Sequence, residues 1–268
     1  MRYCRDSVRD RSNSCMGLAA CRGQYRRRRD SPPGRRPGLQ QLSSARGRCV
    51  SMKYRAVVFD MDGTLVNTIP DITLTVNSVL RRNGLLEKTA GDIEKGVGFG
   101  VEHLLRTLDI PEQMNSSLVR EIDNAYSEMQ QSKAYVYSGV MDLIHRVTVA
   151  GVQMFILSNK LQRSLEKSVS DHLSFAEFVS VTGSQPGHPA KPSPDLLFKM
   201  LERFNVPLDS VLMAGDGEAD VAVAQAAGIP CVSVLWGFRS REALEAAGAD
   251  LFASTPRDLA ELILGVEQ

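Results

Sequence analysis

Short runs of apolar residues recur along the chain, separated by longer stretches in which apolar and polar positions alternate with a helical period. The first of these runs ends at Asp60 and contains no polar position, as expected for a strand buried on both faces. Strands that alternate with helices predict an α/β fold with a doubly wound parallel sheet, which binds ligands beyond the carboxyl ends of its strands. The predicted strands are Ala56–Phe59, Met154–Leu157, Phe178–Val181, Val211–Ala214 and Cys231–Leu235.

A long insertion separates the first two predicted strands. Its apolar positions recur at helical spacing, for example over Ile72–Arg82 and Ser117–Gln130, and it is too long for an ordinary crossover connection. We expect a helical lid, hinged near Ile69–Pro70 and Ala134–Ser138, that covers the site and excludes water; a merely structural subdomain is the alternative. The predicted division is an α/β core, residues 52–69 and 137–268, and a helical cap, residues 70–136.

The first 51 residues differ in composition from the rest of the chain. They contain thirteen Arg, no Lys and three Asp, a net charge of +10, so the remainder must carry −9 for the whole chain to total +1. A polar, Arg- and Pro-rich stretch without apolar periodicity predicts a disordered extension. It could be a basic arm for nucleic acid, a transit peptide or an export signal. Alternatively, translation starts naturally at Met52, and removing residues 1–51 then leaves folding and catalysis intact.

The remaining composition points to an ordinary globular protein, with 43% apolar and 24% charged residues in the whole chain. No run approaches the roughly 18 apolar residues of a membrane-spanning helix. The acidic remainder does not favour nucleic acid as a partner. Four of the five cysteines lie in the first 51 residues without a CxxC pair, which fits neither a zinc site nor a disulfide framework. We expect Cys231 to be a buried core residue and the protein to be cytoplasmic.

The first candidate for chemistry is the sequence Asp60-Met61-Asp62-Gly63-Thr64, which directly follows the first predicted strand. Two carboxylates at positions i and i+2 can face one site, and Gly63 allows a sharp turn after them. A chance match to this pattern in a chain of this length is on the order of one in a thousand. The motif and its position therefore favour a functional site over chance.

Two further elements follow later strands. The Ser158 hydroxyl and the amides that follow it, including that of Asn159, can bind phosphoryl oxygens, although a helix-capping Ser158 is the alternative. Lys191 precedes Pro192, which keeps it extended; we expect Ser193 to be the N-cap of a helix and Pro194 its first residue. Lys191 could then direct its ammonium group from a rigid turn, or it could be a solvated surface lysine.

A second acidic pair, Asp216 and Asp220, follows another predicted strand at a spacing of four residues, which places both on one side of a starting helix. Helix capping alone would explain Asp216, but it would not explain a second acidic pair at the same edge of the sheet. Trp236, Gly237 and Phe238 follow the last predicted strand and either line the entrance or simply pack.

These four elements, in this order, resemble the haloacid dehalogenase superfamily of aspartate-nucleophile hydrolases, from about Tyr54 to the C-terminus. The insertion looks like the helical cap of the phosphoglycolate phosphatase-like branch. Local sequence is also similar over Asn67–Ile72, Val97–Gly100 and Tyr137–Val140. Two departures are Gly217, where the branch commonly has Ser, and Asn67, where it often has Asp.

The resemblance implies a magnesium ion held by the Asp60 carboxylate, the Asp62 backbone carbonyl and Asp216. Asp220 would support the ion indirectly, by holding its ligands or through a water molecule. The ion would neutralise both nucleophile and phosphate. Mg²⁺ is thus the expected cofactor.

The resemblance also implies the roles of the other groups. Asp60 would attack phosphorus, while Ser158, Asn159 and Lys191 bind the phosphate oxygens. Asp62 would protonate the leaving alkoxide and then activate water against the phosphoaspartate, and an acid at this position argues against the dehalogenase branch.

The implied function is hydrolysis of a small phosphate monoester by a soluble monomer or homodimer, with 2-phosphoglycolate as the favoured substrate. Among enzymes, the alternatives are a phosphatase that acts on a sugar phosphate or on pyrophosphate, and a sugar phosphomutase. Outside enzymes, the alternative is a nucleic-acid-binding protein that uses the Arg-rich arm.

Overall fold

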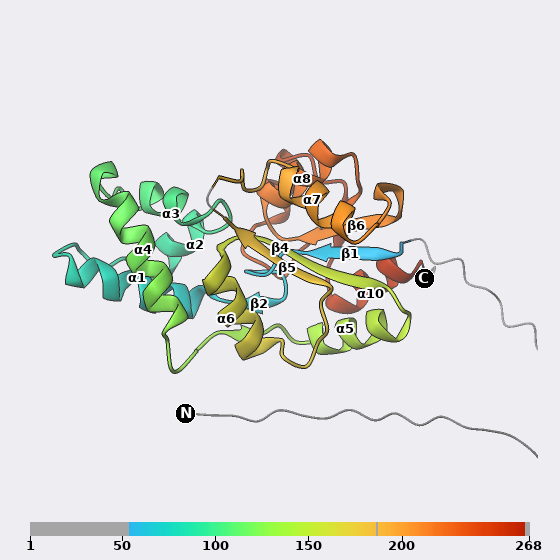
Figure 1. Ribbon diagram of the computed structural model, residues 1–268, viewed down its shortest axis with the longest axis horizontal. Coiled ribbons are helices and arrows are strands. Elements are labelled where there is room, and N and C mark those ends of the chain that lie inside the picture. The colour runs from blue at the N-terminus through green and yellow to red at the C-terminus, as the bar shows by residue number, and fades with distance from the viewer. Residues whose placement is uncertain (1–53, 186, 266–268) are drawn as a thin grey trace, which may run out of the picture. The chain divides into compact units, whose positions relative to one another are not determined.

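The computed structural model describes residues 54–185 and 187–265, so the predicted disordered extension lies outside the described residues. Within them, six parallel strands form one sheet in the spatial order β5-β4-β1-β6-β7-β8. The doubly wound parallel sheet is therefore confirmed, with β1 near its middle (Figure 1). The strands are β1 Ala56–Phe59, β4 Gln153–Leu161, β5 Ser180–Ser184, β6 Val211–Gly215, β7 Cys231–Val234 and β8 Leu251–Ala253.

Helices cover both faces of the sheet. Alternate side chains of β1 point to opposite faces and belong to two different hydrophobic clusters. Val57 and Phe59 pack on the face covered by α5, α6 and α10, whereas Ala56 and Val58 pack on the face covered by α7 and α8 (Figure 1). A strand buried on both sides must be apolar at every position, which explains the unbroken run before Asp60. The helices are α5 Val140–Val149, α6 Gln162–His172, α7 Asp195–Arg203, α8 Glu218–Ala227, α9 Arg241–Ala246 and α10 Pro256–Leu264.

The insertion contains four further helices, which stand beyond the edge of the sheet where its strands end (Figure 1). They bury a hydrophobic cluster of their own, built around Val76, Leu80, Ile93 and Leu105. The helices are α1 Ile69–Arg82, α2 Ala90–Gly96, α3 Val101–Thr107 and α4 Asn115–Ser127.

The two connections of the insertion lie side by side. Strand β2 (Val66–Asn67) pairs antiparallel with β3 (Tyr135–Val136). The buried Asp71 accepts backbone hydrogen bonds from Lys133 (2.6 Å) and Ala134 (3.1 Å). The chain thus leaves and re-enters the α/β part at one place.

Several element boundaries differ from the sequence prediction. Helix α1 begins at Ile69 with Pro70 in its first turn, and α4 already ends at Ser127. Helix α7 begins at Asp195, so Pro194 occupies the N-cap position that we expected for Ser193. The hydroxyl of Ser193 accepts a hydrogen bond from the Asp195 amide instead (3.3 Å). Such differences are common at element ends, where local capping interactions compete.

Two other features of the described residues bear on the sequence analysis. None of their helices is long and apolar enough to cross a membrane. Cys231, which we expected to be a buried core residue, is partly buried and packs against the cluster beneath α7 and α8.

Candidate active site

The predicted site residues converge at the carboxyl ends of the central strands. Asp60 directly follows β1, and its amide donates to the carbonyl of Ala214 in β6 (2.8 Å). One carboxylate oxygen from each of Asp60, Asp216 and Asp220 lies within 4.8 Å of the others, and all three side chains are buried. This arrangement follows from the parallel sheet, in which strand ends meet at one edge.

Lys191 lies between two of these carboxylates. Its Nζ is 2.7 Å from Asp60 Oδ1 and 2.6 Å from Asp220 Oδ1, and its side chain is 3% exposed. A solvated surface lysine is therefore excluded. Burial opposes the charge of Lys191, but Asp220 and Asp60 outweigh this effect and raise its pKa.

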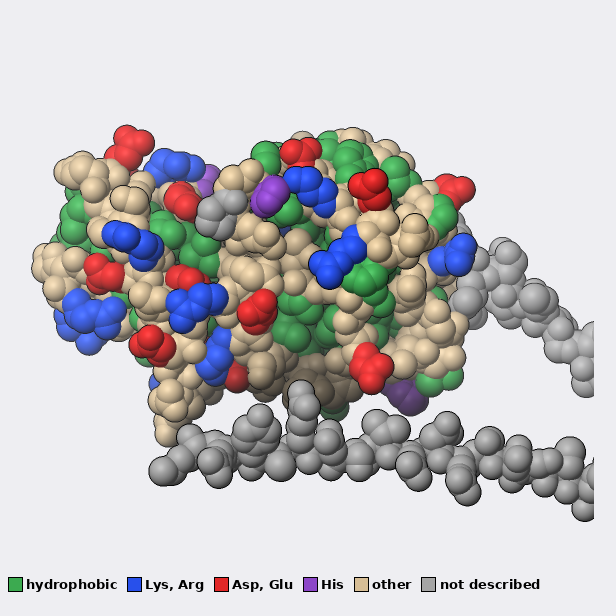
Figure 2. Space-filling view, in the orientation of Figure 1, with side chains coloured by type: hydrophobic (Ala, Val, Ile, Leu, Met, Phe, Trp, Pro, Cys, Tyr) green, Lys and Arg blue, Asp and Glu red, His purple; other side chains and the backbone are tan. Residues whose placement is uncertain are grey.

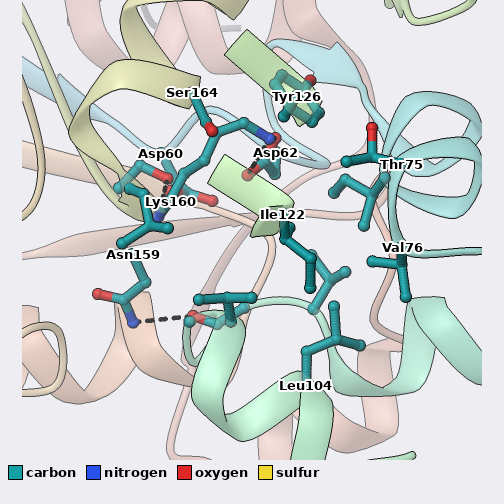
Figure 3. A pocket seen from close by; sticks show the side chains of 17 residues that line it. Asp60, Asp62, Thr75, Val76, Leu104, Ile122, Tyr126, Asn159, Lys160 and Ser164 are labelled. Carbon is teal, nitrogen blue, oxygen red and sulfur yellow. Dashed lines mark hydrogen bonds and ion pairs between the residues drawn. The ribbon is translucent and has the colours of Figure 1, made fainter. Parts of the chain in front are cut away.

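Asn159 holds the Lys191 backbone in place. Its Oδ1 accepts from the Lys191 amide (2.8 Å), and its Nδ2 donates to the Lys191 carbonyl (2.9 Å) and to the carbonyl of Gly98 (2.9 Å; Figure 3 draws the bond to Gly98). These contacts give Asn159 a positioning role, while its predicted contact with phosphate stays a prediction. The buried Ser158 lines a cavity together with Asn159. Ser158 does not cap a helix, because α6 begins at Gln162 with Leu161 as its N-cap.

The electrostatics of the acidic cluster favour a bound cation. Burial raises the pKa of Asp60 to about 7, even though the Lys191 ammonium opposes the shift. Burial, followed by the neighbouring charges of Asp60 and Asp220, raises the pKa of Asp216 to about 8. When all three carboxylates are ionised, they and the one ammonium carry a formal charge of −2 in a buried space. Carboxylate oxygens are hard ligands, so these residues could hold a divalent metal ion.

Asp216 is held in place by Thr64 and Phe238, whose contacts with it the sequence analysis did not predict. Its Oδ1 accepts from the Thr64 hydroxyl (2.9 Å) and its Oδ2 from the Phe238 amide (2.8 Å). A Cβ on Gly63 or on Gly237 would lie 2.2 Å from Asp216 atoms, so each position needs a glycine. In the sequence, the only indication of this role was that Gly63 and Thr64 belong to the first motif and that Gly237 and Phe238 follow the last predicted strand.

Substituting Gly63 tests this close approach. Gly63→Ala is expected to lower the free energy of unfolding by about 1–3 kcal/mol more than Gly84→Ala, because only the first added methyl group overlaps a neighbour. Both glycines have positive φ (+88° and +71°), but a Cβ on Gly84 would meet nothing within 4 Å. Chemical denaturation of both variants measures the difference, and equal losses would mean that Asp216 moves away without cost.

Asp62 has different neighbours from the acidic cluster. Its Oδ1 accepts from the Thr68 hydroxyl (2.6 Å) and from Lys160 Nζ (3.1 Å), and Lys160 is also 3.4 Å from Oδ2. The ammonium of Lys160 lies 4.0 Å from the centre of the Tyr126 ring, which comes from α4. Burial opposes the charge of Lys160, but Asp62 and Tyr126 together raise its pKa. The sequence analysis did not predict these contacts of Lys160.

A cavity of about 80 Å³ opens between these residues and the helices of the insertion. Figure 3 shows Thr75 and Val76 of α1 on the side opposite Asn159, with Ile122 of α4 between them. The cavity thus has one polar wall, made by the strand ends, and one mainly apolar wall. The apolar part of the wall comprises Ile72, Val76, Val97, Val101, Leu104, Ile122 and Leu161.

Acidic and basic side chains are interspersed on the face of the molecule shown in Figure 2, and no single-sign patch covers it. A basic patch or stripe is the usual electrostatic mark of a nucleic-acid-binding surface. This face of the described residues therefore offers no support for the nucleic-acid-binding alternative.

Comparisons with known proteins agree with the geometry. A phosphoglycolate phosphatase of Xanthomonas campestris is 31% identical over 188 residues, which cover 69% of this chain and 85% of that protein. A phosphoglycolate phosphatase of Vibrio parahaemolyticus is 24% identical, with 78% and 96% covered. Sequence similarity thus spans nearly the whole length of the second relative.

Solved structures extend the agreement to the fold. A crystal structure from Lactobacillus delbrueckii, described as a candidate phosphoglycolate phosphatase, is 29% identical with a TM-score of 0.71, and 80% of this chain and 100% of that chain are covered. A haloacid dehalogenase-like hydrolase from Streptococcus pneumoniae, at 20% identity and a TM-score of 0.67 with 78% and 98% covered, shares the fold.

The family model of haloacid dehalogenase-like hydrolases matches residues 57–234, a stretch that contains Asp60, Ser158, Lys191 and Asp216. The predicted family and the predicted enzyme class, a phosphoric monoester hydrolase, are confirmed by these matches. This chain therefore belongs to the haloacid dehalogenase-like hydrolases.

Proposed function

We propose that this protein is a Mg²⁺-dependent phosphatase that hydrolyses 2-phosphoglycolate through a phosphoaspartate on Asp60. The observation that carries the proposal is the convergence of three buried carboxylates and Lys191 beside a small cavity that also contains Asp62. The names of the relatives support the choice of substrate.

The metal is assigned to the acidic cluster. Asp60, Asp216 and the backbone carbonyl of Asp62 would hold Mg²⁺, with Asp220 in support, and the charge of −2 described above suits a divalent ion. When bound, such an ion supplies positive charge that lets an anionic nucleophile approach an anionic phosphate.

In the first half-reaction, a carboxylate oxygen of Asp60 attacks phosphorus while the bond from phosphorus to the leaving oxygen breaks. Asp62 gives its proton to that oxygen, which leaves as an alcohol. Lys191, Ser158 and Asn159 bind the non-bridging phosphate oxygens. Lys191 suits this task because its ammonium already contacts Asp60 (2.7 Å).

In the second half-reaction, Asp62, now a carboxylate, takes a proton from water as the water oxygen attacks phosphorus. The bond from phosphorus to Asp60 breaks, which releases inorganic phosphate and restores both carboxyl groups. The hydrogen bonds from Thr68 and Lys160 would hold Asp62 at one place through both steps.

The helices of the insertion act as a cap in this proposal, with residues 70–136 as the cap and residues 52–69 and 137–268 as the core. Their separate hydrophobic cluster and the adjacent connections of the insertion support such a division. Arg239 of the core donates to the carbonyls of Val97 (2.5 Å) and Glu94 (3.2 Å) at the end of α2, which favours a closed arrangement. A closed cap would exclude water. The cytoplasmic location and a monomeric or dimeric state stay predictions.

The test is phosphate release by the full chain from 2-phosphoglycolate, sugar phosphates and pyrophosphate, with Mg²⁺ and with EDTA. A clear Mg²⁺-dependent preference for 2-phosphoglycolate is expected. Preference for another ester would retain the mechanism and change the substrate, whereas no release from any ester would overturn the proposal.

Asp62→Asn separates the two half-reactions. We expect kcat to fall by about 10²- to 10⁴-fold, with phosphoenzyme accumulating within the first turnover, because no base remains to activate water. Acid quenching after mixing with ³²P-labelled substrate measures the trapped phosphate. The exposed Asp250→Asn is the matched control and should behave like the wild type. A wild-type turnover rate in Asp62→Asn would contradict the assigned role.

A further inference from the structure

The cavity beside the acidic cluster contains a positively charged side chain, Lys160, that contacts no part of the substrate in the reaction described above. Among the described residues that line it, Lys160 provides the one cationic side chain. This side chain is 7% exposed and therefore belongs to the interior of the site. A buried ammonium is costly to maintain unless an anion is close to it, and here Asp62 is that anion until it carries the proton for the leaving oxygen.

The position of Lys160 relates it to the leaving group. Its Nζ is 3.1 Å from Asp62 Oδ1, and Asp62 is the residue that would give a proton to the leaving oxygen. An anionic group one carbon away from that oxygen would therefore lie within reach of Lys160. The ring of Tyr126 on the other side of the ammonium restricts where Nζ can move.

A second polar group lines the same cavity without a partner. Thr75 is 3% exposed, and its hydroxyl has no hydrogen-bond partner among the described residues. Burying an unpaired hydroxyl group costs about 1–3 kcal/mol, so such groups in native proteins commonly meet a ligand or water. A ligand oxygen in this cavity would satisfy Thr75.

The size of the cavity limits what it can bind. Its volume of about 80 Å³ has room for several water-sized groups, and the walls near Val76 and Ile122 are apolar. A leaving group of a few heavy atoms fits a cavity of this size and lining.

We propose that Lys160, together with Thr75, forms a subsite for a carboxylate on the leaving group, so that the enzyme selects phosphate esters of a small hydroxy acid. This inference rests on the proposed phosphatase function. It makes Lys160 a specificity-determining residue in addition to its contact with Asp62.

The experiment compares 2-phosphoglycolate with ethyl phosphate, which has a leaving group of similar length and no carboxylate. The Lys160→Met variant is expected to lose about 10- to 100-fold more kcat/KM on 2-phosphoglycolate than on ethyl phosphate, because one charge-assisted hydrogen bond is lost. Thr75→Val keeps the side-chain shape and should lose about 3- to 10-fold selectively. Lys199→Met, an exposed site on α7, is the matched control and should change neither value.

Inhibition by glycolate gives a second measurement that does not depend on the rate with ethyl phosphate. Glycolate should inhibit wild-type hydrolysis of 2-phosphoglycolate competitively, and its inhibition constant should rise about tenfold or more in Lys160→Met. Thermal denaturation checks that each variant is folded. If Lys160→Met does not fold, Thr75→Val, which removes no charge, still tests the subsite.

Equal losses on both substrates, with an unchanged inhibition constant for glycolate, would overturn the inference, since Lys160 would then act only by holding Asp62. That outcome is distinct from failure of the proposed function. If the wild-type chain releases phosphate from no ester, the function itself is wrong and the subsite inference is overturned with it.

Discussion

Replacing Asp60 by Asn should reduce kcat by about 10⁴-fold or more, because the amide cannot form the covalent phosphate ester on which both half-reactions depend. The substitution should leave the fold intact. It removes one of three carboxylates that crowd a buried space, and Lys191 keeps Asp220 as a partner at 2.6 Å. Phosphate release and thermal denaturation, measured on the same preparation, give both results.

A titration with Mg²⁺ separates a nucleophile from a simple metal ligand. If Asp60 only held the ion, raising the Mg²⁺ concentration would restore the rate of Asp60→Asn. We expect no such recovery. We also expect no labelled phosphoenzyme in this variant, in contrast to Asp62→Asn. Recovery of the rate at high Mg²⁺ would reassign Asp60 and remove the covalent step from the mechanism.

The largest effect on stability is expected from Lys191→Met in the absence of metal. Lys191 is the ion-pair partner of the buried Asp60 and Asp220, so the variant leaves both carboxylates without a positive neighbour. Breaking a buried ion pair from one side typically costs about 3–5 kcal/mol. We expect a loss of this size in the free energy of unfolding when denaturation is followed in EDTA.

The same measurement in saturating Mg²⁺ tests the origin of the loss. A divalent ion bound to Asp60 and Asp216 would compensate part of the unpaired charge, so the cost of Lys191→Met should be smaller with the ion than in EDTA. Lys199→Met, at an exposed position, should lower stability little in either buffer. An equal cost of Lys191→Met in both buffers would argue against a metal site at this cluster.

Much of the candidate site could be predicted from the sequence, because its residues follow buried strands. An unbroken apolar run such as Ala56–Phe59 is readable without coordinates, and parallel strands bring their carboxyl ends to one edge of the sheet. Asp60 and Asp216, far apart in the chain, were expected together for this reason. Carboxylates have few uses in a buried position other than binding a cation or a proton, so their chemistry was also readable.

Features without a strong local pattern escaped prediction. Strand β8, Leu251–Ala253, is short and lies at the edge of the sheet, where a weak apolar signal is enough for pairing with β7. The start of α7 at Asp195 depended on local hydrogen bonds at Ser193 that compete at a helix end. Strand β8 is therefore an element that the prediction omitted, whereas the start of α7 is a small error of position.

The sequence by itself determined the fold, the strand-end residues and the kind of chemistry that they can perform. Only the tertiary structure decided how the cavity beside them is lined. The contact of Lys160 with Asp62 joins residues 98 positions apart, and its contact with Tyr126 requires α4 to pack over α6. The contact with Tyr126 depends on the docking of the helices of the insertion onto the core, and no periodicity along the chain encodes the geometry of that docking.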